Sequence, residues 1–271
     1  MSSGSSVLSR EFYDLGPISD TIGEVHFGTN MLFHSDRTEE GSNFADLISS
    51  SGIRSIRYPG GTISEQFFDP SNPNSTIGQN FFDISDDQSN VETREILPFS
   101  EYLGFIEDIN GIATIVFPTY RYFDRETREI SASAKIEISD FFRGLLRGDF
   151  GVFSSANIEI GNEWYQKNFD WSTDEFGRLQ AEIAKIISET SSSLGLRDNL
   201  SIFAQGGADT SSNVSLASFF EGADEEYIDG VLAHIYGTNS QGNTLGIGGA
   251  IGPRLEGMMD AWESATDSDL M

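Results

Sequence analysis

Hydrophobic residues along this chain fall into short runs that alternate with amphipathic or polar segments. Six such runs predict buried strands, and they cover residues 25–30, 53–58, 112–118, 157–160, 200–204 and 228–236. Bounded apolar runs of this length are typical of strands that are covered on both faces. The intervening segments predict helices over residues 44–51, 99–109, 136–147, 173–193 and around 255–264.

The helix predicted over 173–193 has the clearest amphipathic pattern, with apolar positions at Phe176, Leu179, Ile183, Ile186 and Ile187. Turn residues mark the ends of other elements: Gly52 follows the helix of 44–51, and Pro59-Gly60-Gly61 follows the strand of 53–58. Strands that alternate with helices predict parallel β/α units joined by right-handed crossovers. This α/β pattern fits either a doubly wound sheet or a barrel.

Polar and aromatic residues at the carboxyl ends of several strands favour the barrel. They are Asn30, Arg57-Tyr58, Tyr120, Asn162-Glu163, Gln205 and His234-Ile235-Tyr236. Barrels draw their sites from many strands at this face, whereas a doubly wound sheet binds ligands at one switch point. The first β/α turn also lacks a dinucleotide fingerprint, and the Gly-rich stretch 246–252 predicts a flexible loop rather than a phosphate cradle.

Composition excludes several classes of function. The chain has 16 basic and 43 acidic residues, so its formal charge of −27 argues against nucleic acid or an anionic membrane surface as a partner. Cysteine is absent, and the three histidines are scattered without an H-E-x-x-H pattern, so neither a metal nor another cofactor is expected. No apolar run is long enough to span a membrane, and no secretory signal is visible at the start. We therefore expect a cytoplasmic protein, or an extracellular one exported by a non-classical route.

The segment 157–165 carries the most specific chemistry. Its strand pattern stops at Gly161, and Asn162 and Glu163 then project from the strand end, followed by Trp164 and Tyr165. A carboxylate beside an amide at the carboxyl end of a parallel strand suits protonation of a leaving-group oxygen on a sugar. The alternative is a surface Asn-Glu pair that opens a helix, where the helix dipole favours the glutamate.

Two motifs together resemble the signature of clan A retaining glycoside hydrolases. They are Arg57-Tyr58-Pro59-Gly60-Gly61 and Glu159-Ile160-Gly161-Asn162-Glu163. The nearest resemblance is to the α-L-arabinofuranosidases of family 51 and the bacterial β-glucuronidase-like members of family 79. Residues 27–30 and 234–237 are similar to the same families in position and type, so the resemblance extends from about Gly23 to Gly237.

This resemblance implies a (β/α)8 TIM-type barrel and assigns roles to individual residues. Glu163 would be the general acid/base, and Asn162 would hydrogen-bond the 2-hydroxyl of a carbohydrate substrate. Arg57 would hold the nucleophile carboxylate ionised. On chemical grounds, apart from the resemblance, Tyr236 could donate a hydrogen bond to that nucleophile, and His234 could bridge to the acid/base or simply pack.

Other residues near the strand ends are expected to line the substrate site. They are Asn30, Gly60, Gly61, Tyr120 and Trp164, although aromatic residues after a strand also often pack in the core. The polar segment 62–92 is predicted to be a long insertion loop on the catalytic face. Its pairs Phe67-Phe68 and Phe81-Phe82 are expected to pack beneath that loop.

The sequence departs from the family pattern at the nucleophile. A Glu at the end of a seventh strand is expected, but Glu256 and Glu263 both lie in the predicted helix around 255–264. We therefore predict a single incomplete barrel domain over residues 1–271, with about the first six of eight β/α units and little activity alone. The sequence does not specify an oligomeric state.

Three functions remain open at this stage. The first is a retaining glycosidase that acts on polysaccharide or oligosaccharide side chains such as arabinofuranosides or glucuronides. The second is a non-catalytic carbohydrate-binding remnant of such an enzyme. The third is an unrelated α/β protein with coincidental motifs, which predicts that no cleft joins Arg57 and Glu163.

Overall fold

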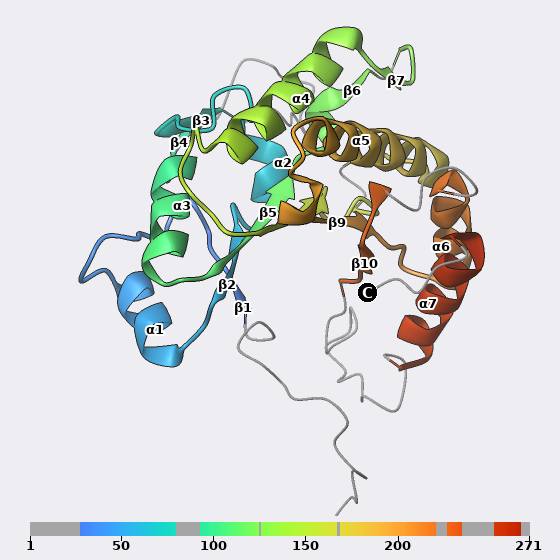
Figure 1. Ribbon diagram of the computed structural model, residues 1–271. Coiled ribbons are helices and arrows are strands. Elements are labelled where there is room, and N and C mark those ends of the chain that lie inside the picture. Colours follow the sequence, from blue (N-terminus) through green and yellow to red (C-terminus); the bar gives the residue numbers. More distant parts are fainter. Residues whose placement is uncertain are drawn as a thin grey trace, which may run out of the picture.

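The computed structural model describes residues 28–79, 93–124, 126–166, 169–220, 227–234 and 252–266. A parallel sheet forms the centre of the molecule (Figure 1). Its strands, in spatial order, are β1 (Gly28–Asn30), β2 (Ser55–Tyr58), β5 (Ile112–Phe117), β8 (Ala156–Ile160), β9 (Leu200–Gln205) and β10 (Gly230–Leu232). Every strand is parallel to its neighbours, and the order of the strands across the sheet is the same as their order along the chain. A doubly wound sheet would contain a switch point, so the predicted barrel order is confirmed.

The sheet curves around a common interior. One pocket of about 380 Å³ is lined by residues from all six strands, including Gly28 of β1 and Leu232 of β10 at opposite edges. Residues from both edges can meet in one pocket only if the sheet curls toward closure. The structure is therefore a partial (β/α) barrel.

Helices cover the outer face of this sheet, where they form an arc around the strands (Figure 1). They are α1 (Asn43–Ser51), α3 (Phe99–Asp108), α4 (Ala132–Arg147), α5 (Thr173–Ser193), α6 (Thr210–Ala217) and α7 (Gly252–Thr266). The bounds of α5 match the prediction, and a capping box of Ser172 and Glu175 fixes its start. Helix α4 begins before the predicted residue 136, because Ser131 caps it by accepting a hydrogen bond from the Ala134 N–H. No helix in the described part of the chain is long and apolar enough to cross a membrane.

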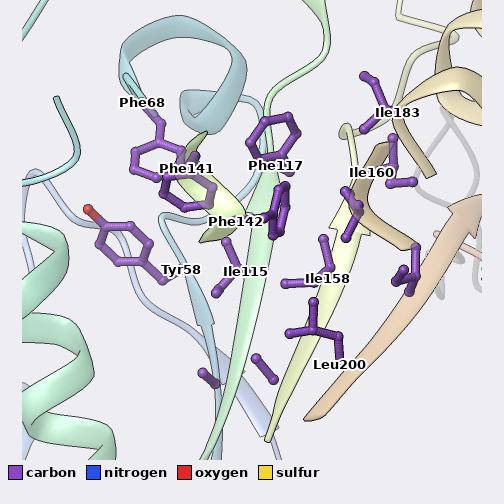
Figure 2. Packing of buried hydrophobic residues seen from close by; sticks show 14 of the residues in the cluster. Tyr58, Phe68, Ile115, Phe117, Phe141, Phe142, Ile158, Ile160, Ile183 and Leu200 are labelled. Atoms are coloured by element: carbon purple, nitrogen blue, oxygen red, sulfur yellow. The ribbon is translucent and has the colours of Figure 1, made fainter. Parts of the chain in front are cut away.

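The hydrophobic core lies between the sheet and these helices. Figure 2 shows buried side chains of β5, β8 and β9 together with Phe141 and Phe142 of α4, and both of these rings pack against Phe117 of β5. The Phe117 ring centroid lies 5.0 Å from that of Phe142. Ile158 and Ile160 of β8 are fully buried in this core, as their alternation predicts. The residues that alternate with them, Asn157 and Glu159, therefore face the barrel interior and line the interior pocket.

The described part of the segment 62–92 is residues 62–79, and these contain short elements. They are α2 (Ile63–Phe67) and β3 (Ile77–Gln79), which pairs antiparallel with β4 (Thr93–Glu95). These elements are too short to show a hydrophobic period, so pattern reasoning missed them. Phe67 and Phe68 are buried in the main core, whereas Phe81 and Phe82 lie outside the described residues.

A few further elements differ from their predicted extent. The pattern also missed α6, whose sequence is rich in Ser, and a second hairpin of β6 (Phe123–Asp124) and β7 (Glu129–Ile130). The sixth predicted strand is shorter, since β10 ends at Leu232, and residues 235–251 lie outside the described ranges. The predicted strand residues 25–27 lie outside them as well.

Candidate active site

The predicted catalytic residues meet at the carboxyl edge of the sheet. A cleft of about 470 Å³ opens there, and its lining residues are Asn30, Arg57, Gly61, Thr62, Glu159, Asn162, Glu163, Leu232, Ala233 and His234. Parallel strands bring their carboxyl ends to one edge, so residues far apart in sequence share this cleft. Arg57 and Glu163 therefore lie in one cleft, which argues against coincidental motifs.

Arg57 is the centre of a partly buried hydrogen-bond network. Its Nε donates to Glu159 Oε2 at 2.7 Å, and its Nη2 donates to Asn162 Oδ1 at 2.9 Å. Its Nη1 donates to Asn30 Oδ1 at 3.1 Å. The guanidinium thus joins β1, β2 and the end of β8, and charge-assisted bonds of this kind hold their partners in fixed orientations.

Glu159 is a site residue that sequence reasoning left without a role. Its side chain is only 7% exposed and forms an ion pair with Arg57. A buried carboxylate without a partner would be costly, and Arg57 of β2, two strands away in the sheet, supplies the cation across the barrel interior. Its place between Ile158 and Ile160 was a usable signal, since a charged residue there must face the barrel interior.

Asn162 is held on both sides of its amide group. Its Oδ1 accepts from Arg57, and its Nδ2 donates to Thr62 Oγ1 at 3.4 Å. The second lone pair on Oδ1 and the second N–H of Nδ2 retain the capacity for further hydrogen bonds. Asn162 is 2% exposed, so the surrounding protein fixes its orientation.

Glu163 occupies a left-handed backbone conformation, with φ of 46°. This conformation is uncommon for a non-glycine residue and is found at functional sites more often than elsewhere. Its Oε1 lies 3.3 Å from His234 Nδ1, and its Oε2 accepts a hydrogen bond from Gln166 Nε2. The Gln166 amide also donates to Thr62 Oγ1 at 3.2 Å, so Thr62 links Glu163 with Asn162.

The two adjacent glycines, Gly60 and Gly61, have different structural roles. Gly60 has φ of 106°, and a Cβ there would lie 2.9 Å from the Met31 carbonyl oxygen, so glycine is required for the turn. Gly61 lines the cleft itself, and a Cβ there would make ordinary contact with the Asn162 amide at 3.7 Å.

Two aromatic residues predicted at the substrate site lie elsewhere. Trp164 is 5% exposed, donates from Nε1 to the Gly206 carbonyl oxygen and stacks on Phe176 with 5.2 Å between ring centroids. It packs in the core because the left-handed turn at Glu163 redirects the chain. Tyr120 packs beside Phe169 and is not among the residues that line the cleft. Tyr236 lies outside the described residues.

Two carboxyl groups face this cleft. Glu163 reaches the cleft with hydrogen-bonding partners on both oxygens, so a proton can be transferred at this carboxyl group. Among the described residues, Glu159 is the other carboxylate that lines this cleft, and Arg57 binds it. Glu256 and Glu263 lie on the outer helix α7 and do not line the cleft. The described residues also contain no group of three His, Asp or Glu side chains arranged to hold a metal ion.

Comparison with known proteins identifies the fold. No protein-family model and no curated protein matches this sequence. Solved structures match it over about nine-tenths of its length. AbfB, a family 51 alpha-L-arabinofuranosidase from Bifidobacterium longum, matches with a TM-score of 0.58 and 12% identity over 90% of this chain. An arabinofuranosidase crystal structure matches with a TM-score of 0.59 and 15% identity over 89% of this chain. The GH51 arabinofuranosidase from Xanthomonas axonopodis pv. citri matches with a TM-score of 0.57 and 10% identity over 90% of this chain.

The matched part is about half of each of these proteins. This chain covers 53% of the first two and 55% of the third. At identities of 10–15%, the likeness shows the fold alone and leaves activity and substrate to be argued from the site. The fold expected from the two sequence motifs, a partial TIM-type barrel like that of family 51, is therefore confirmed.

Proposed function

We propose that this chain carries the acid/base half of a glycoside hydrolase site for the side chains of polysaccharides or oligosaccharides. The observation that supports this most directly is the network that joins Arg57, Asn162 and Glu163 in one cleft at the carboxyl edge of the sheet. An amide beside a carboxyl group in such a cleft suits a sugar hydroxyl and a glycosidic oxygen together.

In this mechanism, Asn162 binds the 2-hydroxyl of the sugar while Glu163 faces the glycosidic oxygen. Glu163 donates its proton to that oxygen as the C–O bond breaks, and it later accepts a proton from the attacking water. A retaining reaction also needs an ionised carboxylate about 5–5.5 Å from the acid to form the glycosyl-enzyme intermediate. In this mechanism, the nucleophile comes from outside the described part of the chain.

The charges of the cleft favour a neutral sugar over a uronic acid. Each of the three Arg57 nitrogens already donates to a protein oxygen, and Glu159 compensates its charge. Two carboxylates line the same cleft, and the whole chain has a charge of −27, so an anionic sugar would be repelled. Arabinofuranosides fit this environment better than glucuronides.

The test compares the binding of 4-nitrophenyl α-L-arabinofuranoside and 4-nitrophenyl β-D-glucuronide by calorimetry. We expect the arabinofuranoside to bind more tightly, and Asn162→Ala to weaken its binding about tenfold, the loss expected for about one well-formed hydrogen bond. Asn43→Ala, at an exposed position on α1, is the matched control and should bind normally. Binding that is unchanged by Asn162→Ala would contradict the proposed site.

A non-catalytic sugar-binding protein is the second candidate. It is favoured by the observation that Arg57 engages Glu159, the other carboxylate among the described residues that line the cleft. The two functions differ in turnover, since the binding protein would hold the aryl arabinofuranoside without releasing 4-nitrophenol. An assay for released 4-nitrophenol separates them when it is run on a longer protein that supplies a nucleophile, because this chain alone is expected to release little product in either case.

A further inference from the structure

Glu65 is a buried carboxylate that the proposed mechanism does not use. It lies in α2 and is 2% exposed. Burial raises the pKa of this carboxyl group, and hydrogen bonds from Tyr120, Thr119 and Asn162 lower the pKa in part. A carboxylate buried without a cation is costly unless its oxygens accept hydrogen bonds, so its partners should explain why it is there.

Four donors converge on this carboxylate from two different strand ends. Its Oε2 accepts from the backbone N–H groups of Thr119 at 2.7 Å and Tyr120 at 2.9 Å. Its Oε1 accepts from the Thr119 hydroxyl at 2.9 Å and from the backbone N–H of Asn162 at 3.2 Å. Glu65 thus ties the segment after β5 to the segment after β8, where the proposed acid is located.

The peptide between Gly161 and Asn162 is held from both sides. Its N–H donates to Glu65, while its carbonyl oxygen accepts from Gln205 Nε2 at 2.6 Å. The space around it is filled, because a Cβ on Gly161 would lie 3.0 Å from Thr119 Cγ2 and 3.3 Å from Glu65 Oε1. The plane of this peptide sets the direction in which the chain leaves the sheet.

We infer that Glu65 is a positioning residue, which together with Gln205 clamps the Gly161–Asn162 peptide and so orients Asn162 and Glu163 in the cleft. This inference rests on the proposed function, because it assigns Glu65 a part in sugar binding through Asn162. A residue that only stabilised the fold would affect unfolding and leave the affinity of the folded protein unchanged.

The experiment measures the binding of 4-nitrophenyl α-L-arabinofuranoside by calorimetry, together with thermal unfolding, for the 271-residue chain and three variants. Glu65→Gln replaces an acceptor oxygen with an NH₂ group that faces the converging donors. Thr119→Val removes one donor and leaves the carboxylate. Asp229→Asn is the matched control, because Asp229 accepts from the Ile202 N–H at 2.7 Å and from Arg197 at 2.8 Å beside the start of β9.

We expect Glu65→Gln to weaken binding about tenfold and Thr119→Val about threefold, as losses of charged and neutral hydrogen bonds at a positioned group. Asp229→Asn should lower the melting temperature without changing the affinity. Wild-type affinity in Glu65→Gln with a lowered melting temperature would overturn the inference. If Glu65→Gln does not fold, unchanged affinity in Thr119→Val overturns it.

A second measurement separates this inference from the proposed function. If the wild-type chain does not bind the arabinofuranoside, the proposed function fails, and nuclear magnetic resonance decides the positioning role. Thr119→Val or Glu65→Gln should then shift the side-chain amide resonances of Asn162 and the carboxyl-carbon resonance of Glu163, whereas Asp229→Asn should not. The absence of such shifts would overturn the inference.

Discussion

Replacing Arg57 by methionine tests the buried network through the stability of the fold. Arg57 is 15% exposed at its side chain and Glu159 is 7% exposed, so both charges are largely removed from water. Arg57→Met leaves Glu159 buried without its cation and also removes the donors to Asn30 and Asn162. Breaking a buried pair in this way costs about 3–5 kcal/mol of unfolding free energy. We expect a loss in that range.

A double-mutant cycle shows whether the cost arises from the pair itself. Glu159→Leu alone should destabilise the protein less, because Arg57 keeps two of its three partners. The variant that combines Arg57→Met with Glu159→Leu should recover much of the loss, since apolar groups often replace a buried pair with little net change. We expect a coupling free energy of about 2 kcal/mol or more between the two sites.

The assay is urea unfolding at equilibrium, followed by the fluorescence of the three tryptophans. The ion pair between Arg143 and Asp140 is the control, because those side chains are 37% and 63% exposed. Arg143→Met should change the unfolding free energy by at most about 1 kcal/mol. Additive effects of Arg57→Met and Glu159→Leu would refute the assignment of a coupled buried pair.

Three further predictions concern the pH dependence, the proposed acid and the glycine motif. Burial raises the pKa of Glu65 above 4.5, so its contribution to stability is fully present below about pH 4.5 and is lost as the pH rises through its folded pKa. In urea unfolding, the wild type should therefore lose stability relative to Glu65→Gln over that range. A stability difference that is independent of pH would contradict this prediction. In a longer protein that supplies a nucleophile, Glu163→Ala should slow aryl arabinofuranosides with poor leaving groups about 10²–10⁴-fold and activated ones far less. Azide should partly rescue the turnover of an activated substrate, because it attacks the glycosyl-enzyme intermediate in place of base-activated water. An equal loss for both substrates would argue against an acid role. Gly60→Ala should cost more than about 1 kcal/mol in urea unfolding, because its φ is 106° and its Cβ would meet Met31, whereas Gly61→Ala should cost less than that.

Much of the fold could be predicted because each strand carries its own apolar run. The strand of 112–118 and the helix of 173–193 show their periods within single segments, and their observed bounds differ from the predictions by at most one residue. The elements that were missed lack such a signal. Helix α2 has five residues, and β3 has three, so both depend on contacts with the rest of the molecule.

The site was predictable where a residue lies near the carboxyl end of a strand or just after it. Arg57 lies in β2, and Asn162 and Glu163 come just after β8, so strand order alone places them at one edge. The partners of these residues could not be found in this way. Glu65 and Gln166 act through hydrogen bonds that depend on how the loops fold back, and neither lies at a strand end.

The contacts that hold the proposed acid all come from the six described strands and their connections. Arg57 of β2 fixes the Asn162 side chain, while Glu65 of α2 and Gln205 of β9 fix the peptide before it. Gln166, from the same connection as Glu163, holds its carboxylate. The orientation of this half of the site therefore does not depend on the group that supplies the nucleophile, so sugar binding by this chain tests the half-site directly.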